Sequence, residues 1–324
     1  MYPPGFAVYI TFGRMNQPSP TPSEVARTVF LVPNDFAASA KSLTDLSAAA
    51  QPALRSISGS FLDSLQGVVR TLSIPFHYTS SQIHGHHWQR IHMAERIRAR
   101  GIENEAEREP AALAIARKRF EEYLQGDGEK QVADDVVDRL LWLKNDPESL
   151  AAARQLTRQG LVLTWSAVEV LARDAFVYLL DGRPAYAELL LSDASNKKRF
   201  SADRVEWQTL ASYGYDLSSN LGTYLISKGD LKNVPAVRSV YGALFPNSDD
   251  LRRALSDRRL WDLSHRRHLI VHKGGVVDQA YLEATGASLS LGDVITVSPD
   301  EVESMLEAAL VMGTELIRQV ANAA

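Results

Sequence analysis

The sequence predicts a mostly α-helical protein, a helical bundle, and three observations support that prediction. Apolar residues recur at three- and four-residue spacing along most of the chain, which is the period of an amphipathic helix. Proline or glycine stands at the ends of several of these runs, where helices begin and stop. No period of roughly 20 to 50 residues repeats, so a solenoid is not expected.

Composition favours a soluble globular protein of one large or two ordinary domains, with 324 residues, 45% of them hydrophobic and 23% charged. There are no cysteines, which excludes disulfides and thiolate chemistry, so we expect a cytoplasmic location. No apolar run approaches the ~20 residues that span a bilayer, and no membrane partner is expected. The net charge of −4 argues against a protein that coats nucleic acid, but it allows a local basic pocket.

The N-terminal part of the chain is expected to hold an arm and a helical accessory region. Residues 1–33 mix aromatic residues with prolines and predict an extended arm. Residues 34–147 predict helices, with two apolar stripes between residues 36 and 72. Residues 93–126 are dense in Glu and Arg, which is typical of a solvated helix face, and Gly126-Asp127-Gly128 breaks that run.

Residues 148–324 predict a second helical domain. Its first helix is a long run that ends at Asp181-Gly182. The buried face predicted for it comprises Leu161, Trp165, Val168, Leu171, Ala172, Ala175, Phe176 and Leu179. Another helix is expected from Asp249 to Lys273. Gly274-Gly275 stops it, because glycine readily takes the left-handed conformation at a helix C-terminus.

Two local signals close the chain. Residues 288–297 alternate in polarity about Gly292-Asp293 and predict a small β-hairpin. Ser298-Pro299-Asp300-Glu301 has the form of a capping box with proline at the first helical position. An amphipathic helix is therefore expected from there to about Val320.

Residues 252–273 carry a net charge of +5 within a chain whose net charge is −4. The basic residues, set against Asp257 and Asp262, are Arg252, Arg253, Arg258, Arg259, Arg266, Arg267 and Lys273. Cations near a helix C-terminus are favoured by the dipole by ~0.3–1 kcal/mol each, which accounts for Lys273 but not for the upstream arginines. Three of the chain's eight histidines, His265, His268 and His272, lie in the same segment.

The run Arg267-His268-Leu269-Ile270-Val271-His272 resembles the signature of HEPN domains, in which an arginine and a polar residue precede a histidine by a few positions. The longer text RRHLIVHKGGVVDQAYL is also similar, and the resemblance covers about residues 155–320. The helix that carries Ser166, Glu169, Arg173 and Asp174 is also similar to a helix of the family, one that is interrupted by polar residues and packs near the signature. The resemblance implies a helical bundle, often a homodimer with facing signatures, and in many members a metal-independent endoribonuclease.

This activity suits the residue types. Attack by the neighbouring 2′-hydroxyl leaves a 2′,3′-cyclic phosphate and needs a proton acceptor and a proton donor, which histidine can supply. An arginine fork stabilises the charge that develops on the phosphate. We expect His272 as general acid/base, Arg267 as phosphate clamp, and His268 as orienting or second proton-transfer group. Arg266 also lies within the permitted spacing, and Lys273 has a supporting role.

Two alternatives stay open. In a regular helix Arg267 and His272 point ~140° apart, so they converge only through local distortion, the reach of arginine, or a partner subunit.

The resemblance allows the chain to be either an enzyme or a non-catalytic HEPN-like module that binds RNA, a nucleotide or a protein. In a purely structural helix, the arginines pair with Glu169 and Asp174 while the histidines are core groups. The resemblance also implies a defence or toxin–antitoxin setting with an antitoxin or regulatory partner.

A second histidine cluster, HGHHWQRIH at His84–His92, is a weaker candidate. His84 and His86 lie close enough to chelate a metal. No carboxylate precedes Glu95, however, and a surface loop or an interdomain contact is the more frequent outcome, so we expect no metal site. Glycine-rich phosphate loops and GxSxG elbows are absent from the sequence, and no cofactor is expected.

Overall fold

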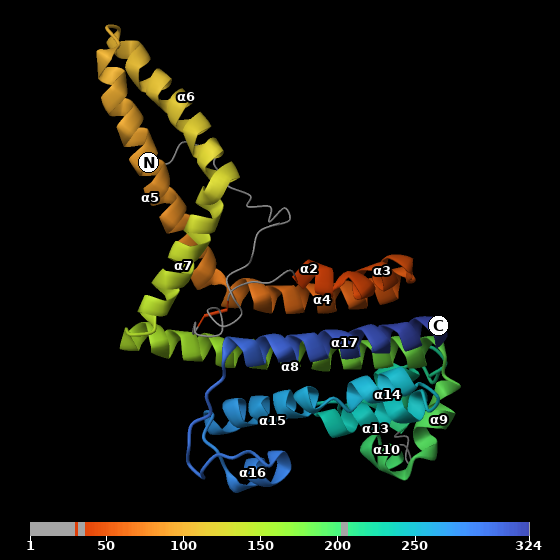
Figure 1. Cartoon of the computed structure of the whole chain (residues 1–324). Coiled ribbons are helices and arrows are strands. Elements are labelled where there is room, and N and C mark those ends of the chain that lie inside the picture. The colour runs from red at the N-terminus through yellow and green to blue at the C-terminus, as the bar shows by residue number, and fades with distance from the viewer. Residues whose placement is uncertain (1–29, 32–35, 202–206, 324) are drawn as a thin grey trace. The chain divides into compact units, whose positions relative to one another are not determined.

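The computed structural model describes residues 30–31, 36–201 and 207–323, which are mainly helical (Figure 1). The predicted mostly α-helical class is therefore confirmed. The arm predicted at residues 1–33 lies outside the described residues, apart from Phe30 and Leu31, which are buried. None of the helices in the described ranges is long and apolar enough to cross a membrane.

The chain divides into two compact units, each built from segments that are distant in sequence. Of the described residues, unit 1 comprises 30–31 and 74–150, and unit 2 comprises 36–73, 151–201 and 207–323. The prediction of one accessory region at residues 34–147 is therefore wrong, because residues 36–73 fold with the C-terminal unit. The later boundary falls inside α8 (Pro147–Gly182), which is a continuous helix and not a linker.

Unit 1 is a set of long antiparallel helices. Its elements are α5 (Ile74–Arg98), η1 (Ala99–Gly101), α6 (Glu105–Tyr123), η2 (Leu124–Gly128) and α7 (Glu129–Leu143). α5 packs along both α6 and α7. The predicted break between these two is confirmed as a kink at Gly126, whose φ of −95° and ψ of −138° are not helical. Glu95 is buried in this unit and forms ion pairs with Arg98 and Arg119.

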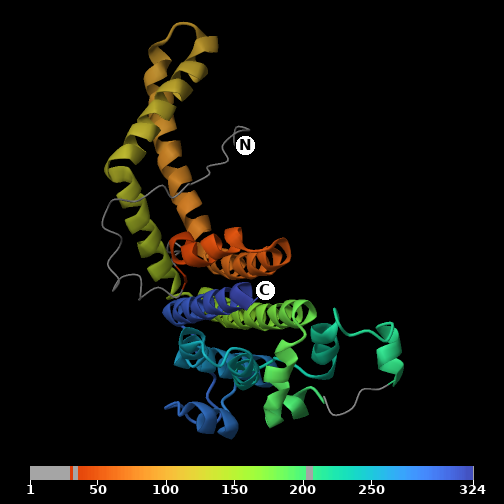
Figure 2. The same cartoon turned by 90° about the vertical axis from the view of Figure 1, so that its right-hand side faces the viewer.

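Unit 2 is layered, with α8 and α17 in the middle (Figures 1 and 2). α3 and α4 pack on α17 from one side, and α14 and α15 pack on it from the other. The elements are α2 (Phe36–Ser39), α3 (Lys41–Ala49), α4 (Pro52–Leu72), α9 (Tyr186–Ser192), α10 (Ala194–Arg199), α11 (Trp207–Ser212), α12 (Leu221–Lys228), α13 (Val234–Leu244), α14 (Asp249–Leu255), α15 (Arg258–Lys273), α16 (Gln279–Thr285) and α17 (Pro299–Ala323).

The core of unit 2 is built on the predicted face of α8. All eight residues expected on that face are buried, and Trp165 and Phe176 are among the largest fully buried side chains. α17 begins at the predicted capping box: the backbone N–H of Ser298 donates to Oε2 of Glu301 at 2.8 Å, and the N–H of Glu301 donates to Oγ of Ser298 at 3.2 Å. Helix period and cap chemistry therefore predict this layer correctly.

The prediction of one helix from Asp249 to Lys273 is wrong. The segment forms α14 and α15, which are separated at Ser256-Asp257. The Asp257 carboxylate accepts the backbone N–H of Arg259 at 2.8 Å and so caps α15. The N-cap of α14 is Ser248, while Asp249 lies in its first turn. The apolar periodicity continues across this point, but Asp257 begins a new helix.

The predicted β-hairpin at residues 288–297 is also absent, since the described ranges contain no strand. Gly292 does turn the chain, with a φ of +87°. Val294, however, forms an isolated antiparallel bridge with Val276, which follows α15. The N–H of Ile295 donates to the carbonyl oxygen of Gly275 at 2.9 Å. The alternating segment therefore pairs with the turn that follows α15, and Ile295 packs in a small core with Leu269.

We predict that Gly222→Ala destabilises unit 2 while Gly67→Ala does not. A Cβ at Gly222 would lie 2.8 Å from both the Cα and the carbonyl oxygen of Val177, and backbone cannot move aside cheaply. Overpacking of this kind typically costs about 1–3 kcal/mol. Gly67 lies in α4 with nothing within 4 Å of a Cβ, so alanine there should stabilise by about 0.5–1 kcal/mol. Urea denaturation of both variants measures this, and equal effects would contradict the prediction.

Candidate functional site

The candidate site lies on α15, whose orientation is set by its apolar residues. Leu260, Leu263 and Leu269 are buried. The helix ends at Gly274, which is left-handed with a φ of +64°, and the N–H of Gly275 donates to the carbonyl oxygen of Leu269 at 3.0 Å. The predicted glycine stop is therefore confirmed, and it places the last turn of α15 at the surface.

His268 and His272 lie together on the exposed side of α15. Both residues are exposed, and their ring centroids are 4.6 Å apart with an interplanar angle of 46°. The helix from Arg258 to Lys273 is continuous, so the four-residue spacing alone brings the rings into contact. The expectation of the structural alternative, that these histidines are core groups, is wrong for this pair.

Arg267 points toward α8 and pairs loosely with Glu169. Its Nη2 lies 3.5 Å from Oε2 of Glu169, and the two side chains are 23% and 21% exposed. The Nε of Arg267 and the Oε1 of Glu169 are buried without a hydrogen-bond partner among the described residues. No hydrogen bond or ion pair within the described ranges joins Arg267 to His268 or His272. Arg267 and the two imidazoles are thus near each other in sequence, but no hydrogen bond or ion pair joins them among the described residues.

Arg266 is held much more tightly. Its Nη2 lies 2.7 Å from Oε1 of Glu301, the same residue that closes the capping box of α17. Burial disfavours charge on both partners. Their ion pair outweighs this effect of burial, and Glu301 also accepts the backbone N–H of Ser298. The pKa of Arg266 is therefore raised and that of Glu301 is lowered. This arginine is committed to the packing of α15 on α17.

The other predicted supporting residues do not reach the histidines. Arg173 pairs with its neighbour Asp174, with Nη2 to Oδ1 at 2.9 Å, and neither forms an ion pair with α15 among the described residues. Lys273 is exposed and forms no ion pair with any described residue. Of the predicted set, the structure brings together His268 with His272, Arg267 with Glu169, and Arg173 with Asp174, as three separate pairs.

The remaining arginines of the basic segment are all neutralised by carboxylates. The pairs are Arg252–Asp249 (3.0 Å), Arg253–Asp250, Arg258–Asp262 (3.0 Å), and Arg259 with both Asp257 (2.8 Å) and Glu307 (2.8 Å). The charge of +5 counted along the sequence therefore does not describe the surface. Five carboxylates from outside the counted segment offset it: Asp249 and Asp250 just before it, Glu301 and Glu307 on α17, and Glu169 on α8.

Arg158 of α8 adjoins the site although it was not among the predicted residues. Its Nη2 donates to the carbonyl oxygen of Ile295 at 2.9 Å, and its guanidinium carbon lies 3.5 Å from where a Cβ of Gly275 would be. Arg158 therefore adjoins the turn that ends α15, three residues beyond His272. Nothing in the local sequence links this arginine to Gly275 and Ile295, and only the fold brings them together.

The second histidine cluster lies on α5, so the expected loop is a helix. Nδ1 of His84 lies 2.8 Å from the carbonyl oxygen of Ser80. His87 pairs with Asp135 of α7, and His92 pairs with Glu109 of α6 at 3.3 Å. Among the residues that the structure describes, no three metal-binding side chains gather as a metal site. His87 and His92 therefore contact neighbouring helices of unit 1, while His84 bonds within α5.

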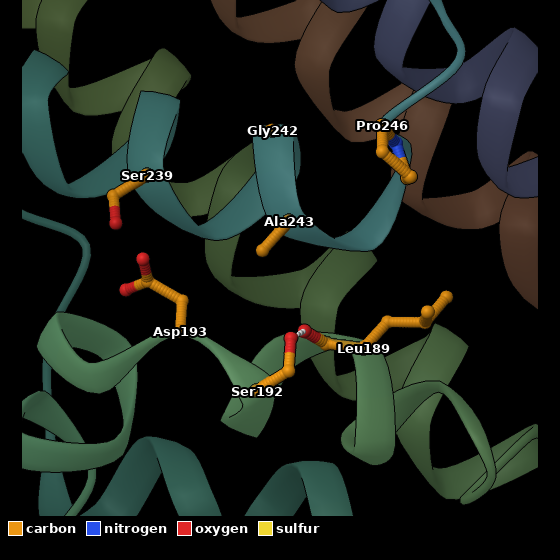
Figure 3. A pocket seen from close by; sticks show the side chains of 7 residues that line it. All are labelled: Leu189, Ser192, Asp193, Ser239, Gly242, Ala243 and Pro246. Carbon is orange, nitrogen blue, oxygen red and sulfur yellow. Dashed lines mark hydrogen bonds between the residues drawn. The ribbon is translucent and has the colours of Figure 1, made fainter.

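A cavity of about 560 Å³ lies between α9 and α13, away from the predicted residues (Figure 3). Its lining residues are Leu189, Ser192, Asp193, Ser239, Gly242, Ala243 and Pro246. Asp193 is also the N-cap of the short helix α10, and its pKa is lowered by hydrogen bonds from Ser195 and Asn196. None of the residues predicted for RNA cleavage lines this cavity.

Comparisons with protein families, with curated proteins and with solved structures find no match to this chain. The geometry of the site and the resemblance in its sequence are therefore the grounds on which a function can be proposed.

We predict that His265 makes unit 2 less stable below neutral pH. Burial, together with the charge of His268, lowers the pKa of His265 below its ordinary value of 6.5, and its ring contacts Trp261 at 4.5 Å. As the pH falls below 6.5, the unfolded chain binds the proton first, so stability decreases over that window. Urea midpoints at pH 7.5 and pH 5.5 test this. The decrease should be smaller in His265→Phe, with His86→Phe as the exposed control, and an unchanged decrease would contradict the assignment.

Proposed function

We propose that the chain is a metal-independent endoribonuclease of HEPN type, acting in the cytoplasm within a defence or toxin–antitoxin setting. The observation that carries the proposal is the exposed pair His268 and His272, at a ring distance of 4.6 Å on the helix whose sequence resembles the HEPN signature. Two imidazoles within reach of one phosphodiester supply both proton transfers that the reaction needs.

The proposed reaction balances without a metal. The substrate's 2′-oxygen bonds to the adjacent phosphorus and loses its proton to one imidazole, while the other imidazole protonates the departing 5′-oxygen. The P–O5′ bond breaks, leaving a 2′,3′-cyclic phosphate and a 5′-hydroxyl. We assign these proton transfers to His268 and His272. The role of Arg267 is to stabilise the extra negative charge on the phosphate.

Arg267 suits the clamp better than Arg266 does. Arg266 has the Glu301 carboxylate at 2.7 Å, whereas Arg267 meets Glu169 only at 3.5 Å. Both arginines keep buried nitrogens without a hydrogen-bond partner among the described residues, Nε and Nη1 in Arg266 and Nε in Arg267, so the length of the ion-pair contact is what distinguishes them. Charge-assisted bonds are typically about 2.7–2.9 Å long, so the Arg267 contact is a weak one. A phosphate can therefore compete for Arg267 at lower cost.

The enzyme is proposed to act as a homodimer. α15 is a continuous helix, so no local distortion turns Arg267 toward His272 within one chain. A twofold contact at this helix would bring the arginine of one chain to the histidines of the other. An antitoxin or regulatory protein is the further partner that the resemblance implies.

A non-catalytic module that binds RNA, a nucleotide or a protein is the alternative. The neutralisation of Arg267 by Glu169, together with its separation from the histidines, favours this function. The two functions differ in one product: only the enzyme yields RNA with cyclic phosphate ends.

We predict that purified protein cleaves RNA in the presence of EDTA and that His272→Ala reduces the rate at least about 100-fold, the effect of one general acid or base. His86→Ala is the matched control, since His86 is an exposed histidine on α5. Gel electrophoresis and end-group analysis measure the products. RNA binding without cleavage by the wild type would favour the alternative, and loss of cleavage on chelation would point to a metal.

We predict that mixing Arg267→Ala with His272→Ala restores cleavage that neither variant has alone. In a mixed dimer one composite site receives its arginine from one chain and its histidine from the other. With free exchange, half the dimers are mixed and half of their sites intact, so roughly a quarter of the wild-type rate is expected. A mixture as inactive as its components, in protein shown to be dimeric and exchanging, contradicts the shared site.

A further inference from the structure

Of the three cations near the end of α15 that have no carboxylate partner among the described residues, only Lys273 belongs to the basic segment 252–273. Every arginine between residues 252 and 267 faces an aspartate or glutamate. Arg158, Arg154 and Lys273 form no ion pair with any described residue. The free positive charge therefore lies where α8 passes the end of α15, outside most of the basic segment.

Arg158 is a cation that is fixed in place yet keeps its charge. Its Nη2 is anchored on the carbonyl oxygen of Ile295 at 2.9 Å, which is a neutral partner. Its Nε is buried and has no hydrogen-bond partner among the described residues. A guanidinium anchored by a carbonyl retains its full charge for a ligand, whereas one paired with a carboxylate does not. Arg158 also lies inside α8, where the helix dipole gives no reason for a cation.

Lys273 and Arg154 are two further cations close to Arg158 in the fold or along α8. Arg158 adjoins Gly275, and Lys273 stands two residues before that glycine, next to His272. On α8, Arg154 is exposed and precedes Arg158 by four residues, which puts both on one side of the helix. The helix dipole can account for Lys273 alone, but it does not account for the two arginines.

We propose that Arg154, Arg158 and Lys273 form a cationic strip that binds the phosphates of an RNA strand beside the scissile one. The inference rests on the proposed function, because the His268–His272 pair defines where the scissile phosphate lies. The strip binds by charge and carries no base recognition, since phosphate contacts position a strand without reading its sequence. Lys273 takes the phosphate nearest to the histidines, and the two arginines take the following ones along α8.

The test measures RNA affinity against salt in a His272→Ala background, so that binding is separated from cleavage. The probe is a short fluorescein-labelled single-stranded RNA, followed by anisotropy. In Arg158→Gln and in Lys273→Gln, the slope of log affinity against log salt should become shallower by about 0.7 for each phosphate that the protein no longer neutralises. The matched controls are Arg252→Gln and Arg253→Gln, which remove arginines that already face aspartates, and their slopes should not change.

Arg158→Lys guards against a folding artefact, because it keeps the charge while altering the Ile295 anchor. It should keep the steep slope if charge is what binds. Equal slopes in all variants, equal weakening by the control substitutions, or no RNA binding at all would each overturn the strip. Displacement of RNA by polyglutamate as effectively as by unlabelled RNA would also overturn it, in favour of an acidic protein partner.

The two proposals fail separately. If the wild type binds RNA with a slope that depends on Arg158 and Lys273 but never cleaves it, the strip stands and the nuclease does not. If it cleaves RNA while both substitutions leave the slope unchanged, the nuclease stands and the strip does not.

Discussion

The burial of one continuous face of α8 is the constraint on which the rest of unit 2 depends. Trp165 and Phe176 are almost wholly buried on that face, and burying a large apolar side chain contributes about 1.5–3 kcal/mol. Once the face is fixed, the polar residues between the apolar ones have fixed positions too. Arg158 and Glu169 are eleven residues apart, about three turns, so they share one side of the helix at a spacing of roughly 16 Å. Glu169 meets Arg267 and Arg158 meets the turn after α15, which means that α15 runs antiparallel to α8. The core thus determines which polar groups of two distant segments meet.

The positive charge that this protein's surface offers to a ligand depends more on which basic residues are paired with carboxylates than on how many there are. Most of the ion pairs of α14 and α15 are exposed, and pairs of that kind contribute little to stability, about 0–1 kcal/mol each. Their larger effect is on the surface potential, because each removes a cation from the set that a phosphate could contact. Arg259, held by Asp257 and by Glu307 of α17, shows how a distant helix supplies the compensation. A cation anchored by a backbone carbonyl, as Arg158 is, escapes that cancellation.

Periodicity and caps were readable from the sequence, while pairing between distant segments was not. The apolar period of α8 predicted its buried face residue by residue, and Ser298 with Glu301 predicted the start of α17, because both signals are local. The break at Asp257 was missed because an apolar repeat on both sides concealed a cap. The hairpin prediction was wrong for a different reason. An alternating pattern predicts extended backbone but does not identify the segment with which it pairs, and here Val294 pairs with Val276. The contacts of Glu301 and Arg158 depend on helix packing that no local pattern encodes.

The regularity of α15 sets the terms for any chemistry at this site. Side chains four apart on a helix meet and side chains five apart do not, so the helix joins His268 to His272 and turns Arg267 away from both. The arginine faces α8, where its contact with Glu169 leaves one donor and one acceptor unused. Its contact of 3.5 Å is longer than the 2.7 Å contact of the Arg266–Glu301 pair, so the Arg267–Glu169 pair costs less to open. In the proposed dimer, a phosphate between two copies of α15 draws Arg267 from Glu169, and the cost is a Glu169 carboxylate, 21% exposed, that loses its arginine. A helix that separates its own arginine from its histidines therefore favours a site completed by a second copy.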